Sequence, residues 1–202
     1  MLQFFQSGSP ADAQAAARLI HDSDPAYYDF WFGSAQAALS CLEKLWLAPA
    51  GSLSHAQTNV WREDGRLAVL VCHYPAGDEA RLAEADTQAQ GLLRGDLAQL
   101  QQREAMLAWL FPHLPADVWY LQTFAVSAER RGCGLGSQVL ADIESAARAH
   151  GALELHTDVD SANPSALRFY QSHGFEIVTA TRVPMLEPFS LPASFRMAKK
   201  LF

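Results

Sequence analysis

The stretch Arg130-Arg131-Gly132-Cys133-Gly134-Leu135-Gly136 decides the fold of this chain, because it separates two segments of different hydrophobic periodicity. Before it, the apolar run at residues 120–126 predicts a buried strand. After it, apolar residues recur at helical spacing and predict a helix with one buried face. These apolar residues are Val139, Leu140, Ile143, Ala146 and Ala147. The order is therefore strand, glycine-rich turn and helix.

The glycine-rich turn is suited to binding an anion. Gly132, Gly134 and Gly136 at alternate positions allow a tight bend and leave the backbone N–H groups uncovered by side chains. At a helix N-terminus such donors bind anions, assisted by the helix dipole. Arg130 and Arg131 add positive charge. We therefore expect a pyrophosphate group as the ligand.

The spacing of the glycines separates three kinds of pyrophosphate-binding loop. A P-loop requires a lysine after its last glycine, but Gly136 is followed by Ser137. A dinucleotide fingerprint requires Gly-x-Gly-x-x-Gly, whereas Gly132, Gly134 and Gly136 lie at alternate positions. The third pattern, Arg/Gln-x-x-Gly-x-Gly/Ala, is satisfied by Arg131, Gly134 and Gly136.

A second motif follows the predicted helix. Residues 155–159 alternate like a half-buried strand. Asn163 followed by Pro164 is typical of a helix start, and Gly174 is placed where a glycine would end that helix. Residues 163–175 together fit the pattern Asn-x-x-Ala-x-x-x-Tyr-x-x-x-Gly-Phe.

In this order, the two motifs resemble the two signatures of the GNAT acyltransferase superfamily, over residues 120–175. The resemblance implies an α/β (α+β) fold with a mixed, mostly antiparallel central sheet flanked by helices, and one domain over residues 1–202. It further implies direct transfer of an acetyl group from acetyl-CoA to a primary amine. The alternative is a catalytically silent acyl-CoA-binding sensor or interaction module on the same fold.

The resemblance also implies roles for individual residues. Backbone groups of Phe124 and Val126 would pair with the pantetheine arm, and the Phe124 N–H would donate to the thioester carbonyl. Asn163 would contact the same arm, and the Tyr170 hydroxyl would act as general acid toward the CoA sulfur. The full set of expected cofactor-binding residues is Phe124, Ala125, Val126, Arg131, Gly132, Cys133, Gly134, Leu135, Gly136, Ser137, Asn163, Ala166, Phe169 and Tyr170.

The residue that would deprotonate the amine is not apparent. Many members of the resembled family carry a glutamate four residues before the carbonyl-binding position, where this chain has Tyr120. The next residue on the same face, Gln122, is no useful proton acceptor. The alternatives are His73, an acidic residue from residues 75–115, a chain of water molecules, or an amine that arrives neutral.

Residues 75–115 depart from a compact member of the resembled family. Their length and composition predict an insertion that is mostly helical over residues 80–110 and covers a sheet edge or the acceptor cleft. Residues 78–117 hold seven acidic residues and three arginines. This excess fits either a solvated helical face or a lid that attracts a cationic amine.

The other predicted elements complete the sheet and its helices. One helix begins at Ser9 and runs to about residue 20, and another begins at Ser34. The dipeptide Asp64-Gly65 predicts a hairpin turn. Aromatic residues gathered at 27–32 belong either to the core or to a substrate pocket. The remaining predictions are strands at 59–63, 67–73, 176–181 and 195–201 and a loop at 183–192.

Charge and composition exclude several classes of protein. The net charge of −7 argues against nonspecific nucleic-acid binding. There is no apolar run of transmembrane length and no basic leader, so we expect no membrane association and a cytoplasmic location. The three widely spaced cysteines indicate reduced thiols, and the histidines lack metal-binding spacing, so no metal is expected. We expect a monomer or a homodimer.

Overall fold

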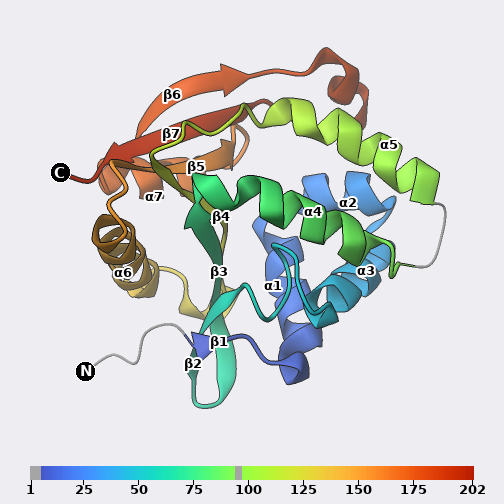
Figure 1. Ribbon diagram of the computed structural model, residues 1–202, viewed down its shortest axis with the longest axis horizontal. Helices are drawn as coiled ribbons and strands as arrows, with labels where there is room; N and C mark the ends of the chain where they lie inside the picture. The colour runs from blue at the N-terminus through green and yellow to red at the C-terminus, as the bar shows by residue number, and fades with distance from the viewer. Residues whose placement is uncertain (1–5, 94–96) are drawn as a thin grey trace.

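In the computed structural model, which describes residues 6–93 and 97–202, seven strands form one sheet in the order β1-β2-β3-β4-β5-β7-β6 (Figure 1). All neighbouring strands are antiparallel except β4 and β5, which are parallel. The predicted mixed, mostly antiparallel sheet is therefore confirmed. The strands are β1 (Gln6–Ser7), β2 (Asn59–Glu63), β3 (Arg66–Pro75), β4 (Val118–Val126), β5 (Glu154–Asp160), β6 (Glu176–Thr181) and β7 (Ser194–Lys200).

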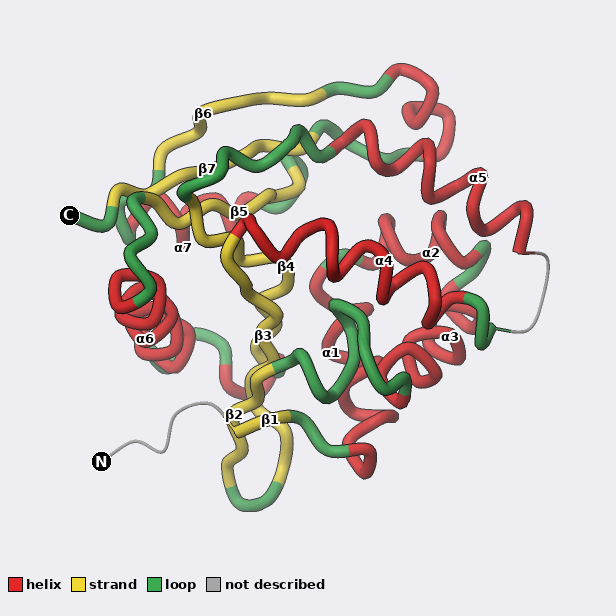
Figure 2. The backbone as a smooth tube through the Cα atoms, in the orientation of Figure 1, coloured by secondary structure: helices red, strands yellow, loops and turns green. Residues whose placement is uncertain are grey.

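Helices cover both faces of this sheet (Figures 1 and 2). Three N-terminal helices pack on one face and two later helices pack on the other. The first group is α1 (Ala13–Ser23), α2 (Pro25–Phe32) and α3 (Ala35–Leu47), and the second is α6 (Leu135–Ala149) and α7 (Pro164–Ser172). The predicted flanking of the sheet by helices is confirmed.

The middle of β3 shows why the sheet needs helices on both faces. Leu70 packs in the apolar cluster of α1, α2 and α3, whereas Val69 and Val71 pack in the cluster of α6 and α7. Successive side chains of a strand point to opposite faces, so a strand covered on both sides is apolar at every position. All three side chains are buried.

Three helical segments begin in the same way, with a polar residue followed by proline. The side-chain oxygens of Ser9, Asp24 and Asn163 each accept a hydrogen bond from a backbone N–H two or three residues further on. Each bond satisfies one of the donors that a helix start leaves free. The starts predicted at Ser9 and Asn163 are confirmed, although the first begins as a 3-10 turn. Helix α2, which begins after Asp24, was not predicted.

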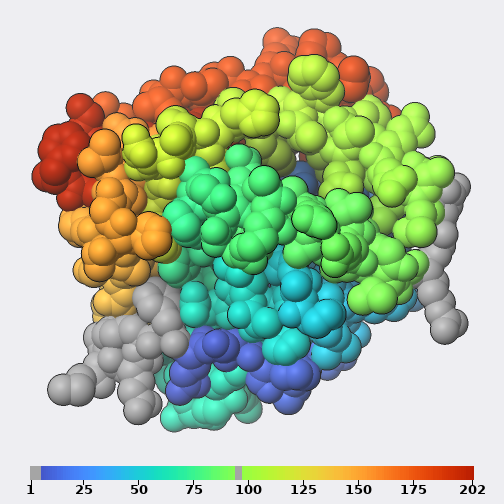
Figure 3. Space-filling model, viewed as in Figure 1, coloured from blue at the N-terminus to red at the C-terminus, as the bar shows by residue number. Residues whose placement is uncertain are grey.

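The segment between β3 and β4 folds as α4 (Glu79–Gln90), α5 (Leu97–Leu107) and a 3-10 turn (Ala108–Leu110). Its predicted helical character is confirmed for the residues described. The side-chain amide of Gln90 donates to Glu104 at 2.7 Å and so joins the two helices. In Figure 3 their atoms, green to yellow-green, lie over the blue and cyan N-terminal part of the chain. They therefore form an outer layer on the side of α2 and α3.

One predicted segment was wrong. Residues 183–192, predicted as a loop, contain a 3-10 helix at Pro184–Phe189. Pro184 lies in the first turn, where a missing backbone N–H costs nothing, so proline here starts a helix and does not exclude one. The side chain of Leu186 in this helix is buried in the cluster of the N-terminal helices. The segment is therefore part of the core.

A buried ion pair joins β5, β7 and the chain that leads into β4. Arg196 contacts both carboxylate oxygens of Asp158, at 2.8 and 2.7 Å, and also donates to the carbonyl of Pro112 at 2.8 Å. Both side chains of the pair are only 4% exposed. Breaking such a pair leaves a buried charge without a partner, which is costly.

We expect Arg196→Met to lower the free energy of unfolding by about 3–5 kcal/mol, because it strands the carboxylate of Asp158 in the interior. The matched control is Arg182→Met, whose pair with Glu187 is 74% and 44% exposed. It should change stability by less than about 1 kcal/mol. Denaturant titration of both variants measures the difference, and equal losses would show that the buried pair does not stabilise this junction.

Candidate functional site

The two central strands diverge in the middle of the sheet. β4 and β5 pair only from Val118 with Glu154 to Leu121 with Thr157. β3 remains paired with β4 as far as Val126, and β5 remains paired with β7 along its whole length. Beyond Leu121 the edge of β4 that faced β5 is therefore open.

The register of β4 shows which backbone groups face this opening. The N–H of Ser127 donates to the carbonyl of Ala68 at 2.9 Å, next to the end of the β3–β4 ladder. In antiparallel strands, hydrogen-bonded pairs alternate with pairs that are not hydrogen-bonded. Ala125 therefore bonds to β3, and the N–H groups of Phe124 and Val126 point away from it. This is the pair of residues expected to meet the pantetheine arm.

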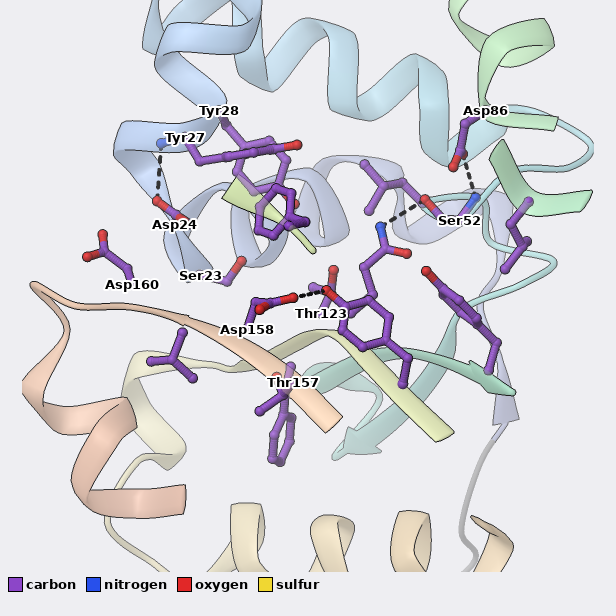
Figure 4. A pocket seen from close by; sticks show the side chains of 18 of the residues that line it. Ser23, Asp24, Tyr27, Tyr28, Ser52, Asp86, Thr123, Thr157, Asp158 and Asp160 are labelled. Atoms are coloured by element: carbon purple, nitrogen blue, oxygen red, sulfur yellow. Dashed lines mark hydrogen bonds between the residues drawn. The ribbon is translucent and has the colours of Figure 1, made fainter. Parts of the chain in front are cut away.

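A cavity of about 370 Å³ lies where the strands diverge (Figure 4). β4 and β5 contribute to its walls, together with α2, α4 and α5. Four of the residues expected from the sequence line it: Phe124, Asn163, Ala166 and Tyr170. Residues far apart in the sequence, from both motifs, are thus brought to one cavity.

The glycine loop lies outside the cavity and has the backbone that its glycines allow. Gly132 and Gly134 have φ of +76° and +83°, a left-handed conformation that other residues rarely adopt. A Cβ at either position would meet nothing within 4 Å, so the loop is open to a ligand. Gly134 immediately precedes α6, where backbone N–H groups lack helical partners. These features match an anion site.

The two arginines beside the loop differ in their contacts. Arg131 is exposed, and its Nε donates to the carbonyl of Val126 at 3.0 Å. Arg130 instead pairs with Glu63 at 2.6 Å, so it adds less positive charge than the sequence suggested. The exposed thiol of Cys133 donates to the Arg130 carbonyl at 2.8 Å and does not line the cavity.

The glycine loop and α7 are in direct contact. A Cβ at Gly136 would meet the ring of Phe169 at 3.4 Å, so the start of α6 lies within van der Waals distance of α7. The Phe169 and Phe124 rings meet edge to face with centroids 5.8 Å apart. Ser137 and His173 share a hydrogen bond of 2.9 Å. The two sequence motifs therefore form one continuous structure from the loop to the cavity.

Two of the expected residues that do not line the cavity have side chains in the core. Ala125 packs in the cluster of the N-terminal helices, and Leu135 packs in the cluster of α6 and α7. Any contact they make with a ligand would use main-chain atoms. Their side chains serve the core.

Tyr170 is 6% exposed, and its side chain lines the cavity. Burial raises the pKa of Tyr170 well above its usual range, against a smaller lowering by a hydrogen bond with Thr157. The hydroxyl is therefore protonated at neutral pH. Asn163, at the start of the same helix, accepts a hydrogen bond from Ala166 N–H at 3.0 Å and so caps α7.

Acidic side chains dominate the charge of the cavity. In Figure 4 Asp24 and Asp160 lie on one side of it and Asp86 on the other. The only basic residue among the described lining residues is Arg196, which is paired with Asp158. The acidic lining residues are Asp24, Glu79, Asp86, Glu104, Asp158 and Asp160.

Asp24 is a functional candidate that the sequence analysis missed. Burial raises the pKa of Asp24 to about 6, opposed by the hydrogen bond from Tyr27 N–H and assisted by the negative charge of Asp160. The available signal was the pair Asp24-Pro25, the same kind of helix start as Ser9-Pro10. It would have indicated a helix there, with an acid at its first turn.

Asp86 comes from α4, in the segment of residues 75–115. The backbone N–H of Ser52 donates to its Oδ1 at 2.6 Å, and the Gln122 side chain donates to Ser52 Oγ at 3.0 Å (Figure 4). Burial raises the pKa of Asp86, against those hydrogen bonds from Ser52. Acidic residues of this segment thus reach the cavity. An acid from residues 75–115 was one of the alternatives named for the residue that would deprotonate the amine.

His73, the other named alternative, is excluded by its position. Its ring does not line the cavity, and its Nδ1 accepts a hydrogen bond from the Trp119 indole at 2.8 Å. Burial lowers the pKa of His73 to about 4. Tyr120, at the position of the family glutamate, donates its hydroxyl to Asp158 at 2.8 Å.

The sequence left open whether the aromatic residues at 27–32 belong to the core or to a pocket, and they belong to both. Tyr28 and Trp31 are buried members of the core cluster, and with Tyr27 they also line the cavity. Phe111 packs its ring against Tyr27, with centroids 5.8 Å apart. One wall of the cavity is therefore a surface of the core.

None of the helices that the structure describes is long and apolar enough to cross a membrane. Residues 6–93 and 97–202 also contain no group of three or more His, Cys, Asp or Glu arranged to hold a metal ion.

Comparisons with known proteins agree with this geometry. Acetyltransferase Atu2258 of Agrobacterium fabrum (strain C58 / ATCC 33970) is 34% identical over 93 residues, which are 46% of this chain and 63% of that protein. The match thus spans less than two thirds of this relative.

Solved structures show the same fold. An N-acetyltransferase from Staphylococcus aureus Mu50 has a TM-score of 0.70 at 16% identity, over 96% of this chain and 98% of that one. PaiA N-acetyltransferase from Thermoplasma acidophilum, in complex with coenzyme A, has a TM-score of 0.54 at 13% identity, over 97% of each chain.

A family model describes the greater part of the chain. The model of the acetyltransferase (GNAT) family matches residues 19–175, which include the diverging strands, the glycine loop and α7. The chain therefore belongs to the acetyltransferase (GNAT) family.

Proposed function

We propose that this protein is an N-acetyltransferase that moves an acetyl group from acetyl-CoA directly to a primary amine. The divergence of β4 and β5 carries this proposal, because it gathers the Phe124 backbone, Asn163 and Tyr170 around one cavity. The acidic walls of the cavity favour an amine as the acceptor. The half-buried carboxylate of Asp24 supplies the proton acceptor that a silent binding module would not need.

The donor half of the site is formed mainly by backbone groups. The N–H groups of residues 131–136 bind the pyrophosphate, and the open edge of β4 at Phe124 and Val126 pairs with the pantetheine arm. The open, left-handed backbone at Gly132 and Gly134 supports the first role. The related PaiA structure, which contains coenzyme A, supports the choice of cofactor.

Gly134→Asp should abolish acetyl-CoA binding, since it adds a negative charge where the pyrophosphate lies. Acetyl-CoA at about 100 times its Kd should raise the Tm of the wild-type protein by about 5–10 °C and leave that of the variant unchanged.

Gly65→Asp is the matched control. Gly65 also has positive φ and no atom within 4 Å of a Cβ, but it lies in the β2–β3 hairpin. Its Tm shift with acetyl-CoA should equal that of the wild type. A normal shift for Gly134→Asp, measured by differential scanning fluorimetry, would remove the loop from the donor site.

The transfer requires one new bond, one broken bond and two proton movements. The amine nitrogen forms a bond to the thioester carbon, and the carbon–sulfur bond breaks. The Phe124 N–H donates to the carbonyl oxygen as negative charge develops on it. Asp24 takes a proton from the amine, and Tyr170 donates its hydroxyl proton to the leaving sulfur. The products are an N-acetylated amine and free CoA.

Tyr170→Phe should lower the single-turnover rate by about 10²–10⁴-fold and leave the acetyl-CoA Tm shift intact, because only a hydroxyl is lost. Tyr74→Phe is the control, since Tyr74 is also a buried tyrosine of the cavity. Release of the CoA thiol under conditions where chemistry limits the rate is the measurement. Equal rates for the two variants would exclude Tyr170 as the acid.

Asp24 is placed and ionised for proton acceptance. It lies on the same side of the cavity as Asp160, which is hydrogen-bonded through its carbonyl to the N–H of Asn163 at 2.9 Å (Figure 4). Its neighbours Tyr27 and Tyr28 are both neutral, because burial raises the pKa of each. With a pKa of about 6, Asp24 is a carboxylate at neutral pH and a stronger base than an exposed aspartate.

We expect kcat/KM of the wild-type protein to fall with decreasing pH below about 6, as Asp24 becomes protonated. Asp24→Asn should remove this acidic limb and lower the rate at pH 7.5 by about 10²–10⁴-fold, while asparagine still caps α2. The exposed neighbour Asp22 provides the control, Asp22→Asn, which should keep the limb.

The contribution of Asp24 to the stability of the folded protein should change with pH in the opposite direction to kcat/KM. The folded pKa of Asp24 lies above its unfolded value, so its contribution to stability is present at low pH and is lost as pH rises through about 6. At pH 7.5 Asp24→Asn should therefore unfold at a Tm no lower than that of the wild type.

If Asp24→Asn retains the acidic limb of kcat/KM, Asp24 is not the residue that accepts the proton from the amine.

A further inference from the structure

We infer, resting on the acetyl transfer proposed above, that the acceptor is a small aliphatic diamine. Its reacting amine lies at Asp24, and its second, protonated amine lies at Asp86. The two carboxylates come from different elements, α2 and α4, and lie on different sides of the cavity (Figure 4). A ligand with a positive group at each end matches this arrangement.

In the part of the chain that the structure describes, the carboxylates on the two sides have no cationic partner. Among the described residues, none forms an ion pair with Asp24, Asp86 or Glu104. The Nε and Nη2 groups of Arg196 donate to Asp158 and to the carbonyl of Pro112, so its charge is paired with that of Asp158. Charges held away from water are costly unless they are paired. A dication would therefore bind favourably, because it supplies the positive charge that these carboxylates lack.

Asp86 is held in a fixed orientation. Ser52 N–H binds one of its oxygens at 2.6 Å, and Gln122 in turn binds Ser52. Asp86 lines the same cavity as Tyr27, Tyr28 and Tyr74, and its negative charge contributes to the raised pKa of these three tyrosines. The charge of Glu104 adds to that of Asp86 and strengthens this pole for a cation.

Aromatic rings line the same cavity as the two carboxylates. Tyr27, Tyr28 and Trp31 line the cavity along α2, and Tyr120 lines it from β4. Such rings pack against methylene groups and attract cations to their faces. Arg196 already lies over the Tyr120 ring, 5.4 Å from its centre. An aliphatic chain with an ammonium group at each end therefore meets favourable contacts along its length.

The same charges exclude related acceptors. An amino acid with a carboxylate at its far end would place negative charge against Asp86 and Glu104, and like charges repel. A monoamine of the same length would leave the carboxylate of Asp86 without a cationic partner. Discrimination among amines should therefore depend on the group at the far end.

The first test uses the wild-type protein and needs no variant. CoA thiol release is measured with acetyl-CoA and each of 1,3-diaminopropane, 1,4-diaminobutane, 1,5-diaminopentane, n-butylamine and 4-aminobutyrate. The best diamine should exceed butylamine in kcat/KM by about 10–100-fold, the range of a hydrogen bond to a charged group. 4-Aminobutyrate should be slower than butylamine.

The second test assigns the far pole. Asp86→Asn should lower the ratio of diamine to butylamine kcat/KM by about 10–100-fold. Glu84→Gln is the matched control, because Glu84 is an exposed residue of the same helix that does not line the cavity. It should leave the ratio unchanged. If Asp86→Asn does not fold, the wild-type series still decides the question.

The outcomes separate the two proposals. Equal kcat/KM for butylamine and the diamines, or equal ratios in Asp86→Asn and Glu84→Gln, would overturn the diamine and leave acetyl transfer standing. No CoA release above thioester hydrolysis with any amine, while acetyl-CoA still raises the Tm, would overturn acetyl transfer and the diamine with it.

Discussion

The site depends on the point at which β4 leaves β5. Up to Leu121 the strands pair and close the core beneath α6; beyond it no backbone ladder joins them. The buried Thr157 hydroxyl donates to the Leu121 carbonyl at 2.9 Å, which satisfies an acceptor where the ladder ends. The next residue, Asp158, is held to β7 by Arg196. These side-chain bonds lie at the point where the β4–β5 pairing ends.

Buried carboxylates in this protein fall into two kinds that residue type alone does not distinguish. Asp158 is neutralised by Arg196 and serves the fold. Among the described residues, Asp24 and Asp86 are held by neutral donors, and burial raises the pKa of each. Carboxylates held away from water without a cationic partner are costly to the free protein, and such groups are found mainly at functional sites. A cationic ligand would supply the partner that Asp24 and Asp86 lack.

The sequence predicted the elements around the proposed donor side far better than those around the proposed acceptor side. Residues 59–63 and 163–175 form the expected elements because local capping and alternation decide them. Helix α2 was missed because aromatic residues surround it on all sides and hide any helical periodicity. Asp86 could not be singled out among the acids of α4, since which face of that helix meets the cavity is decided by tertiary packing with Ser52, a distant residue.

This difference has a physical origin in the kinds of atoms that each half of the site uses. The donor half presents backbone N–H groups from β4 and the glycine loop, so its requirements appear in the sequence as glycines and helix caps at fixed spacing. The acceptor half presents side chains from α2, α4 and α5, and the fold does not require any particular ones. Under the proposed function, changes in α4 and α5 would alter which amine fits while the contacts to the donor stay the same. In this chain, α4 places Asp86 on the side of the cavity opposite Asp24 (Figure 4).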